Sequence, residues 1–185
     1  MTTSTWRPIL ASVAFLAAAT LSGMACFINR WVVTANVEQR LGLFEFCSRS
    51  ASKECRQTYE DPFSGSCANI TRDDWETRVL RLQVAGTLMI MGCTLCLIGA
   101  LVSSPLLERY SYAMGLTGFI SGCAFLTAVV LFVTIDKSSY CFSSGASFHY
   151  PFGFAIASVP VAWIAGLLAF QTTKRLLQLW DRQVK

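Results

Sequence analysis

The chain has 185 residues and a formal net charge of +4; 54% of its residues are hydrophobic and only 14% are charged. A soluble domain of average composition carries a charge on about a quarter of its residues, so the composition argues against a soluble enzyme or a nucleic-acid-binding domain. The charges are also clustered and leave four long uncharged segments, whereas a soluble fold with four buried helices would need a larger polar shell.

Each uncharged segment is long enough to cross a membrane as a helix. A hydrocarbon core about 30 Å thick requires about 20 apolar residues. We therefore predict one domain over 1–185, an all-α membrane four-helix bundle with a small extracellular antiparallel sheet in its first outer loop. The predicted spans are about 8–28, 82–107, 112–135 and 150–171. The outer loops are then 29–81 and 136–149, and the cytoplasmic tail is 172–185.

The first span has a second interpretation, a cleaved signal peptide. Arg7 and the run 11–19 fit its basic and apolar regions, and residues 21–23 resemble a cleavage site. The apolar run continues to Ile28, beyond the usual apolar region of about 7–15 residues, so a membrane span is favoured. With a signal peptide only three spans would remain, and the termini would lie on opposite sides.

The first loop is predicted to contain a small antiparallel sheet. Residues 31–34 and 43–46 are rich in β-prone side chains, and Gly42 fits a turn or a bulge. Cys47 and Cys55 are separated by seven residues, a distance at which a disulfide can join two antiparallel strands. Four outer-loop cysteines allow three connectivities for two bridges.

The second span is predicted to begin well before its apolar run. Thr71-Arg72-Asp73-Asp74 resembles a helix N-terminus, and a helix starting there would continue directly into the membrane. Within the span, Cys93 and Cys96 have the spacing of a thioredoxin-like motif. They lie among Met and Leu residues, where a cysteine acts as a small hydrophobic side chain, and we therefore expect no redox role.

Small residues recur at helical spacing in the third and fourth spans. The pairs are Gly118 with Gly122, and Ala162 with Gly166. Such pairs let helix backbones approach closely in lipid. They predict packing inside the bundle; the alternative is a dimerisation face.

The second outer loop ends in an aromatic run. His149 is the only histidine, so no histidine cluster can bind a metal. It lies among Phe148, Tyr150, Phe152 and Phe154, which are typical of an aromatic belt at the membrane interface.

Charge and motifs place both termini in the cytoplasm. The short cytoplasmic flanks have an excess of basic residues, as the positive-inside rule requires. Asn69-Ile70-Thr71 in the first loop is an N-glycosylation sequon, which is used only on the luminal or extracellular side. Cys67 and Cys141, with the two cysteines named above, lie on that same oxidising side.

No span contains an acidic or basic side chain in its centre. Proton relays and ion-coupled transporters ordinarily place ionisable groups there. No catalytic dyad or metal set is visible either. We therefore expect a protein that is not an enzyme, has no cofactor and does not bind nucleic acid.

The first loop resembles that of a known superfamily. Trp31, then Gly42-Leu43-Phe44, then Cys47 and Cys55 are similar to the pattern of the claudins, peripheral myelin and epithelial membrane proteins, and calcium-channel gamma subunits. The four-span topology and the aromatic run 147–154 are similar as well. The resemblance implies that Cys47 and Cys55 form a disulfide and that the first-loop motif contacts partners.

The resemblance leaves Cys67 and Cys141 for a second disulfide, unless they stay free or pair between chains. Three features depart from the claudin pattern. Residue 44 is Phe where the family has Trp, Cys67 and Cys141 are additional, and the chain ends Gln-Val-Lys without the Tyr-Val terminus by which many claudins bind PDZ scaffolds.

Two functions are implied by the resemblance. The first is an adhesion, junction or barrier component of the plasma membrane, which acts by lateral and cell–cell contacts with copies of itself or with claudin-like relatives. The alternative is an auxiliary gamma-type subunit that modulates the gating or trafficking of an ion channel or receptor.

Overall fold

The structure is a computed structural model, which describes residues 6–28, 30–33, 39–48, 55–57, 72–102, 111–134 and 147–183. Its main elements are four helices: α1 (Trp6–Phe27), α2 (Arg72–Val102), α3 (Ser111–Val133) and α4 (Tyr150–Gln183). All four are long and apolar enough to cross a membrane. The chain is thus consistent with a multi-pass membrane protein with four spans.

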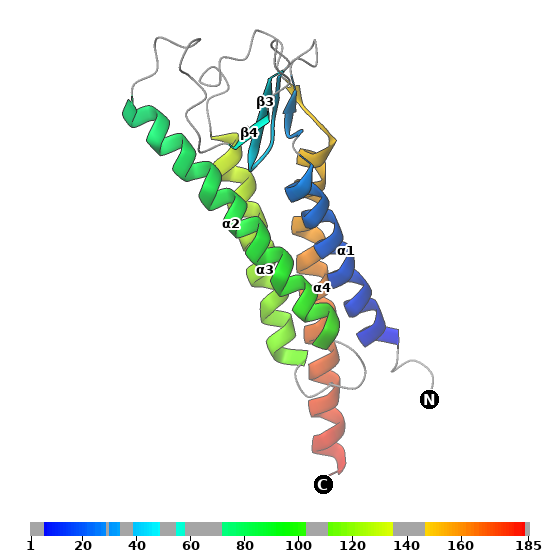
Figure 1. Ribbon diagram of the computed structural model, residues 1–185. Coiled ribbons are helices and arrows are strands. Elements are labelled where there is room, and N and C mark those ends of the chain that lie inside the picture. Colours follow the sequence, from blue (N-terminus) through cyan, green and yellow to red (C-terminus); the bar gives the residue numbers. More distant parts are fainter. Residues whose placement is uncertain are drawn as a thin grey trace.

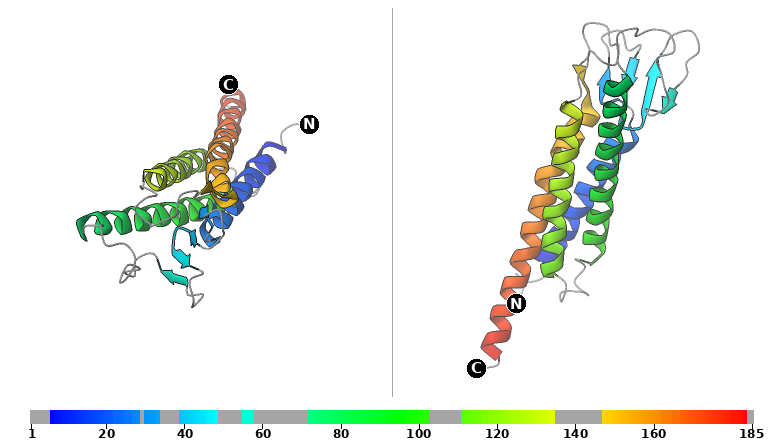
Figure 2. Two further views of the ribbon diagram at one scale, coloured as in Figure 1. Left: turned by 90° about the horizontal axis from the view of Figure 1, so that it is seen from above. Right: turned by 90° about the vertical axis from the view of Figure 1, so that its left-hand side faces the viewer.

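The helices form an up-and-down bundle (Figure 1). Each packs against two neighbours, in the order α1, α2, α3, α4 and back to α1. Trp6 and Gln183 lie at the same end of the bundle, and the sheet lies at the other end (Figure 1). At the sheet end, α2 leans away from the other helices, as Figure 1 and the view from above in Figure 2 show.

Two helices extend further than the predicted spans. Helix α2 begins at Arg72, as the pattern at 71–74 predicts, and its 31 residues are about 46 Å long. It ends at Val102, and the last predicted span residues, 103–107, lie outside the described residues. Helix α4 continues through most of the segment predicted as a tail, because 172–183 contains no Gly or Pro and is rich in Leu, Lys, Arg and Gln.

The sheet has five antiparallel strands in the order β4-β3-β2-β1-β5. Four come from the first loop: β1 (Val32–Val33), β2 (Gln39–Leu41), β3 (Glu45–Ser48) and β4 (Cys55–Gln57). The fifth, β5 (Ser147–Phe148), comes from the second loop and pairs with β1. The prediction of a sheet in the first loop alone was therefore incomplete, since two residues are too few to show an alternating pattern.

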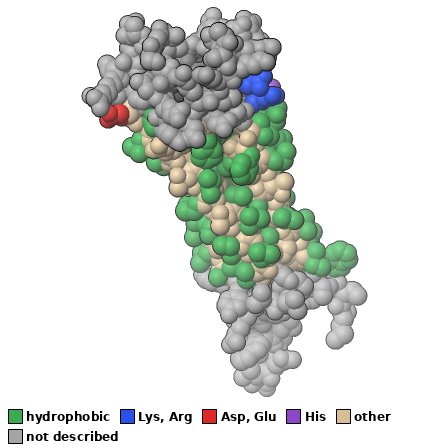
Figure 3. Space-filling view, in the orientation of Figure 1, with side chains coloured by type: hydrophobic (Ala, Val, Ile, Leu, Met, Phe, Trp, Pro, Cys, Tyr) green, Lys and Arg blue, Asp and Glu red, His purple; other side chains and the backbone are tan. Residues whose placement is uncertain are grey.

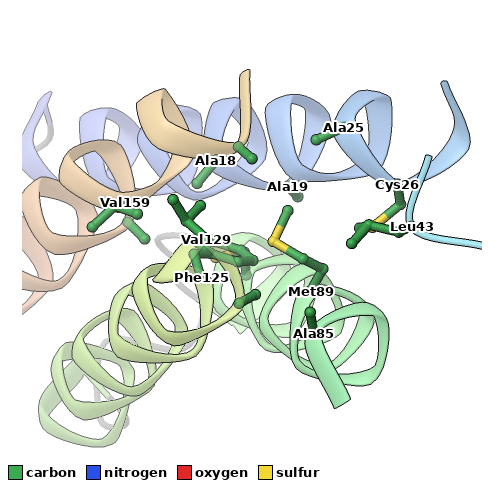
Figure 4. Packing of buried hydrophobic residues seen from close by; sticks show 14 of the residues in the cluster. Ala18, Ala19, Ala25, Cys26, Leu43, Ala85, Met89, Phe125, Val129 and Val159 are labelled. Atoms are coloured by element: carbon green, nitrogen blue, oxygen red, sulfur yellow. The ribbon is translucent and has the colours of Figure 1, made fainter. Parts of the chain in front are cut away.

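The bundle core combines many buried alanines on α1 and α4 with larger buried side chains, such as Phe15 of α1, Met89 of α2 and Phe125 of α3. Figure 4 shows Met89 of α2 pointing toward Ala19 of α1, with Phe125 and Val129 of α3 between the helices. Alanines are fully or almost fully buried along both small-residue helices: Ala11, Ala18, Ala19, Ala25, Ala155, Ala162, Ala165 and Ala169. These alanines let the two helices approach closely.

The outer faces of the helices are suited to lipid. Figure 3 shows hydrophobic side chains over the visible face of the bundle. Threonine hydroxyls exposed on these faces donate to the carbonyl four residues earlier at 2.8–2.9 Å: Thr20, Thr87, Thr94 and Thr127. Their polar groups are therefore satisfied within their own helix, as a bilayer requires.

Candidate functional site

Trp31 lies where the sheet meets the bundle. Its side chain is 0% exposed, and its indole Nε1 donates to the carbonyl of Ala25 in the last turn of α1 at 2.6 Å. Its backbone N donates to Leu41 O at 2.8 Å and its carbonyl accepts from His149 N at 3.0 Å. One residue thus joins the end of α1, strand β2 and the chain entering α4.

The indole also packs against aromatic side chains from two other helices. Its ring centroid is 4.6 Å from that of Phe132 in α3 and 5.7 Å from that of Phe152 in α4. Phe152 in turn stacks on Phe148 of β5 at 4.3 Å. We call Trp31, Phe132, Phe148 and Phe152 the junction cluster. Phe148 and Phe152, predicted as part of an aromatic belt at the membrane interface, thus also make contacts inside the chain.

The Gly42-Leu43-Phe44 segment docks on two helices. Leu43 is 1% exposed and lies beside Cys26 of α1 (Figure 4). Phe44 lies against Gly86 of α2, where an added Cβ would be 2.5 Å from the ring. Gly86 was not singled out from the sequence, because a lone glycine in an apolar span carries no signal of what covers it.

The first-loop motif was predicted to contact partners. In the structure Trp31, Gly42 and Leu43 are buried within the chain, and only Phe44 presents surface, with 37% of the side chain exposed. The buried side chains fix the position of the sheet on the bundle. A partner would meet the surface that they hold in place.

Cys47 and Cys55 are Cα partners in the β3–β4 register. Directly opposed residues in an antiparallel pair have Cα atoms about 4.5–5.5 Å apart, which is within the range that a disulfide spans. Only the backbone of these two residues is described, so the disulfide stays a prediction. Asn69, Cys67 and Cys141 lie outside the described residues.

The small residues of the third and fourth spans face one another. A Cβ on Gly118 would lie 2.6 Å from the Cα of Gly166 and 2.9 Å from the carbonyl oxygen of Ala162. A Cβ on Gly122 would meet the indole of Trp163. All four of these small residues are buried within the bundle.

We predict that Gly118→Ala lowers the free energy of unfolding by about 1–3 kcal/mol, as overpacking does in a well-packed core. The new methyl group would meet backbone atoms, which cannot rotate away. Unfolding by SDS titration in mixed micelles measures the change. Gly23→Ala in α1 is the matched control, since its Cβ would meet nothing within 4 Å; equal losses in both variants would contradict the prediction.

The four cysteines inside the spans are free thiols: Cys26, Cys93, Cys96 and Cys123. The thiol of Cys93 donates to the carbonyl of Ala19 at 3.4 Å. Within the described part of the chain, no three His, Cys, Asp or Glu residues form a group that could hold a metal ion. Cys26 and Cys96 are buried in the bundle, Cys93 is half-buried, and Cys123 is exposed.

No protein-family model matches the chain, and no curated protein matches it.

Proposed function

We propose that this chain is a non-enzymatic membrane protein that acts through protein contacts, as an adhesion, junction or barrier component. The observation that carries the proposal is the sheet held to the bundle by Trp31, through hydrogen bonds to three separate elements. A surface fixed in this way loses less conformational entropy on binding than a flexible loop. It is therefore suited to recognition.

The proposed family is the claudin-like superfamily. The motif of Trp31 and Gly42-Leu43-Phe44 supports it, and so do the four helices with an antiparallel sheet at one end. The buried positions of Trp31 and Leu43 give a physical reason for such a motif, because both side chains join the sheet to the bundle.

Clustering of non-adherent cells that express the full chain tests the contact function. We expect labelled expressing cells to cluster with one another, and Trp31→Ala cells, compared at equal surface amounts, to cluster less. Failure of the unchanged chain to cluster cells above the level of untransfected cells would overturn the adhesion proposal.

The second candidate function is an auxiliary gamma-type subunit of a channel or receptor. Two features of α2 favour it: the helix leans outward (Figure 2), and its side chains Leu80 and Val84 are exposed. A larger membrane protein could cover this flank. Recovery of a stoichiometric multi-span partner by affinity purification from native membrane, without clustering of cells, would select this function.

Both functions require the sheet to face outside the cell, which predicts that Asn69 is glycosylated. Glycosidase treatment should increase the mobility of the protein on a gel, and Asn69→Gln should reproduce the shift without treatment. Thr71→Ala removes the sequon by its other essential residue and serves as the matched variant. The absence of any mobility shift when the unchanged chain is treated with glycosidase would argue against this orientation.

A further inference from the structure

Exposed aromatic and basic side chains gather where α1 ends and α4 begins. Val32 and Phe148 are register partners, and His149 N donates to Trp31 O at 3.0 Å. Arg30 precedes Trp31 and Tyr150 follows His149, so both residues adjoin this hydrogen-bonded pair. Figure 3 shows basic side chains beside the single histidine, at the upper edge of the apolar surface.

The guanidinium group of Arg30 is available for an anion. The residue is half-buried, and its side chain has no hydrogen-bond or ion-pair partner in the part of the chain that the structure describes. It lies just beyond the last residue of the first span. At that depth the anions are the phosphates of lipid headgroups, and a guanidinium group binds phosphate through paired N–H donors.

Tyr150 presents an aromatic surface beside this charge. Its side chain is 46% exposed, with the His149 ring at 4.6 Å and the Phe154 ring edge-on at 5.8 Å. Exposed aromatic faces attract quaternary ammonium groups. Phe27, the last residue of α1 and three residues before Arg30, is 90% exposed and offers an apolar contact.

We propose that Arg30, Tyr150 and Phe27 form a binding site for a phosphocholine lipid. Arg30 holds the phosphate, the ring of Tyr150 accepts the quaternary ammonium, and Phe27 lies along an acyl chain. The phosphate and ammonium of this headgroup are joined by two carbons, which suits two side chains that adjoin one backbone hydrogen bond, from His149 N to Trp31 O. The site requires only that the helices lie in a bilayer, so the contact function can fail without affecting it.

Native mass spectrometry of the full chain in neutral detergent tests the site with four probes: phosphatidylcholine, sphingomyelin, phosphatidylglycerol and dioleoylglycerol. We expect both phosphocholine lipids to stay bound, phosphatidylglycerol to bind less and dioleoylglycerol, which has no phosphate, to bind least. A difference between the first two would identify the lipid backbone that is preferred. Dioleoylglycerol bound as tightly as phosphatidylcholine would overturn the proposal.

Two variants test which side chain binds the phosphate and which binds the quaternary ammonium of the headgroup. Arg30→Gln is expected to weaken phosphatidylcholine binding about tenfold, the loss of one charge-assisted contact, and Tyr150→Leu about threefold. Arg7→Gln, at the opposite end of α1, is the matched control and should bind as the unchanged chain does. Circular dichroism checks that each variant is folded, and Arg30→Gln with unchanged affinity would overturn the site.

Discussion

Trp31→Ala is expected to lower the free energy of unfolding by about 3–5 kcal/mol, the range for removal of a large buried aromatic side chain. The side chain is fully buried and contacts Phe132 and Phe152, so its removal leaves a cavity where α1, α3, α4 and the sheet meet. The carbonyl of Ala25 also loses its indole donor. SDS titration in mixed micelles, followed by circular dichroism, measures the loss.

Two Phe variants separate the hydrogen bond of Trp31 from its packing. Trp31→Phe keeps a ring but removes the N–H that donates to Ala25, and we expect a cost of about 1–3 kcal/mol. Trp163 is the matched position, because its indole N–H is buried without a hydrogen-bond partner among the described residues. Trp163→Phe should therefore be neutral or stabilising. Equal losses at both positions would show that packing alone accounts for the effect of Trp31.

Cys47→Ser is expected to lower the free energy of unfolding by about 2–4 kcal/mol and to reduce the amount of protein at the cell surface. The register places Cys47 opposite Cys55, and a disulfide there would close the β3–β4 hairpin. The cost arises mainly because the reduced chain has more freedom when unfolded. Mass mapping of non-reduced peptides identifies the bridge directly.

The double variant Cys47→Ser with Cys55→Ser should lower the free energy of unfolding no more than either single variant does, because all three variants remove the same disulfide. Cys123→Ser is the control, since its thiol is free and exposed on α3. The same mass map tests the prediction that Cys67 pairs with Cys141. Free thiols at 47 and 55 would contradict the first pairing, and free thiols at 67 and 141 would contradict only the second.

The helices could be predicted from the sequence because an apolar run of fixed length has few alternatives in a bilayer. The early start of α2 was also predictable, since Thr71 and the two aspartates carry a local capping pattern. The length of an apolar run does not predict the helical extension of α4, because residues 172–183 are amphiphilic and basic.

The candidate site was only partly predictable. Trp31 and Leu43 were identified by a motif, but a motif does not show whether a side chain is buried in the chain or exposed to a partner. The partners Phe132, Phe152 and Gly86 come from three different helices. Such contacts depend on how the helices pack, and in an apolar span a core phenylalanine has the same local sequence as a lipid-facing one.

Strand β5 has a consequence for biosynthesis. It pairs with β1 and leads into α4, whose Phe152 packs on Trp31. On the ribosome, the first loop is therefore translated long before its last partner emerges, and β1 has one edge unpaired until then. A chain that terminates before Ser147 would expose that edge and half of the junction cluster. Chaperones bind exposed strand edges and apolar side chains of this kind. Completion of the sheet would thus report that the fourth helix has been inserted.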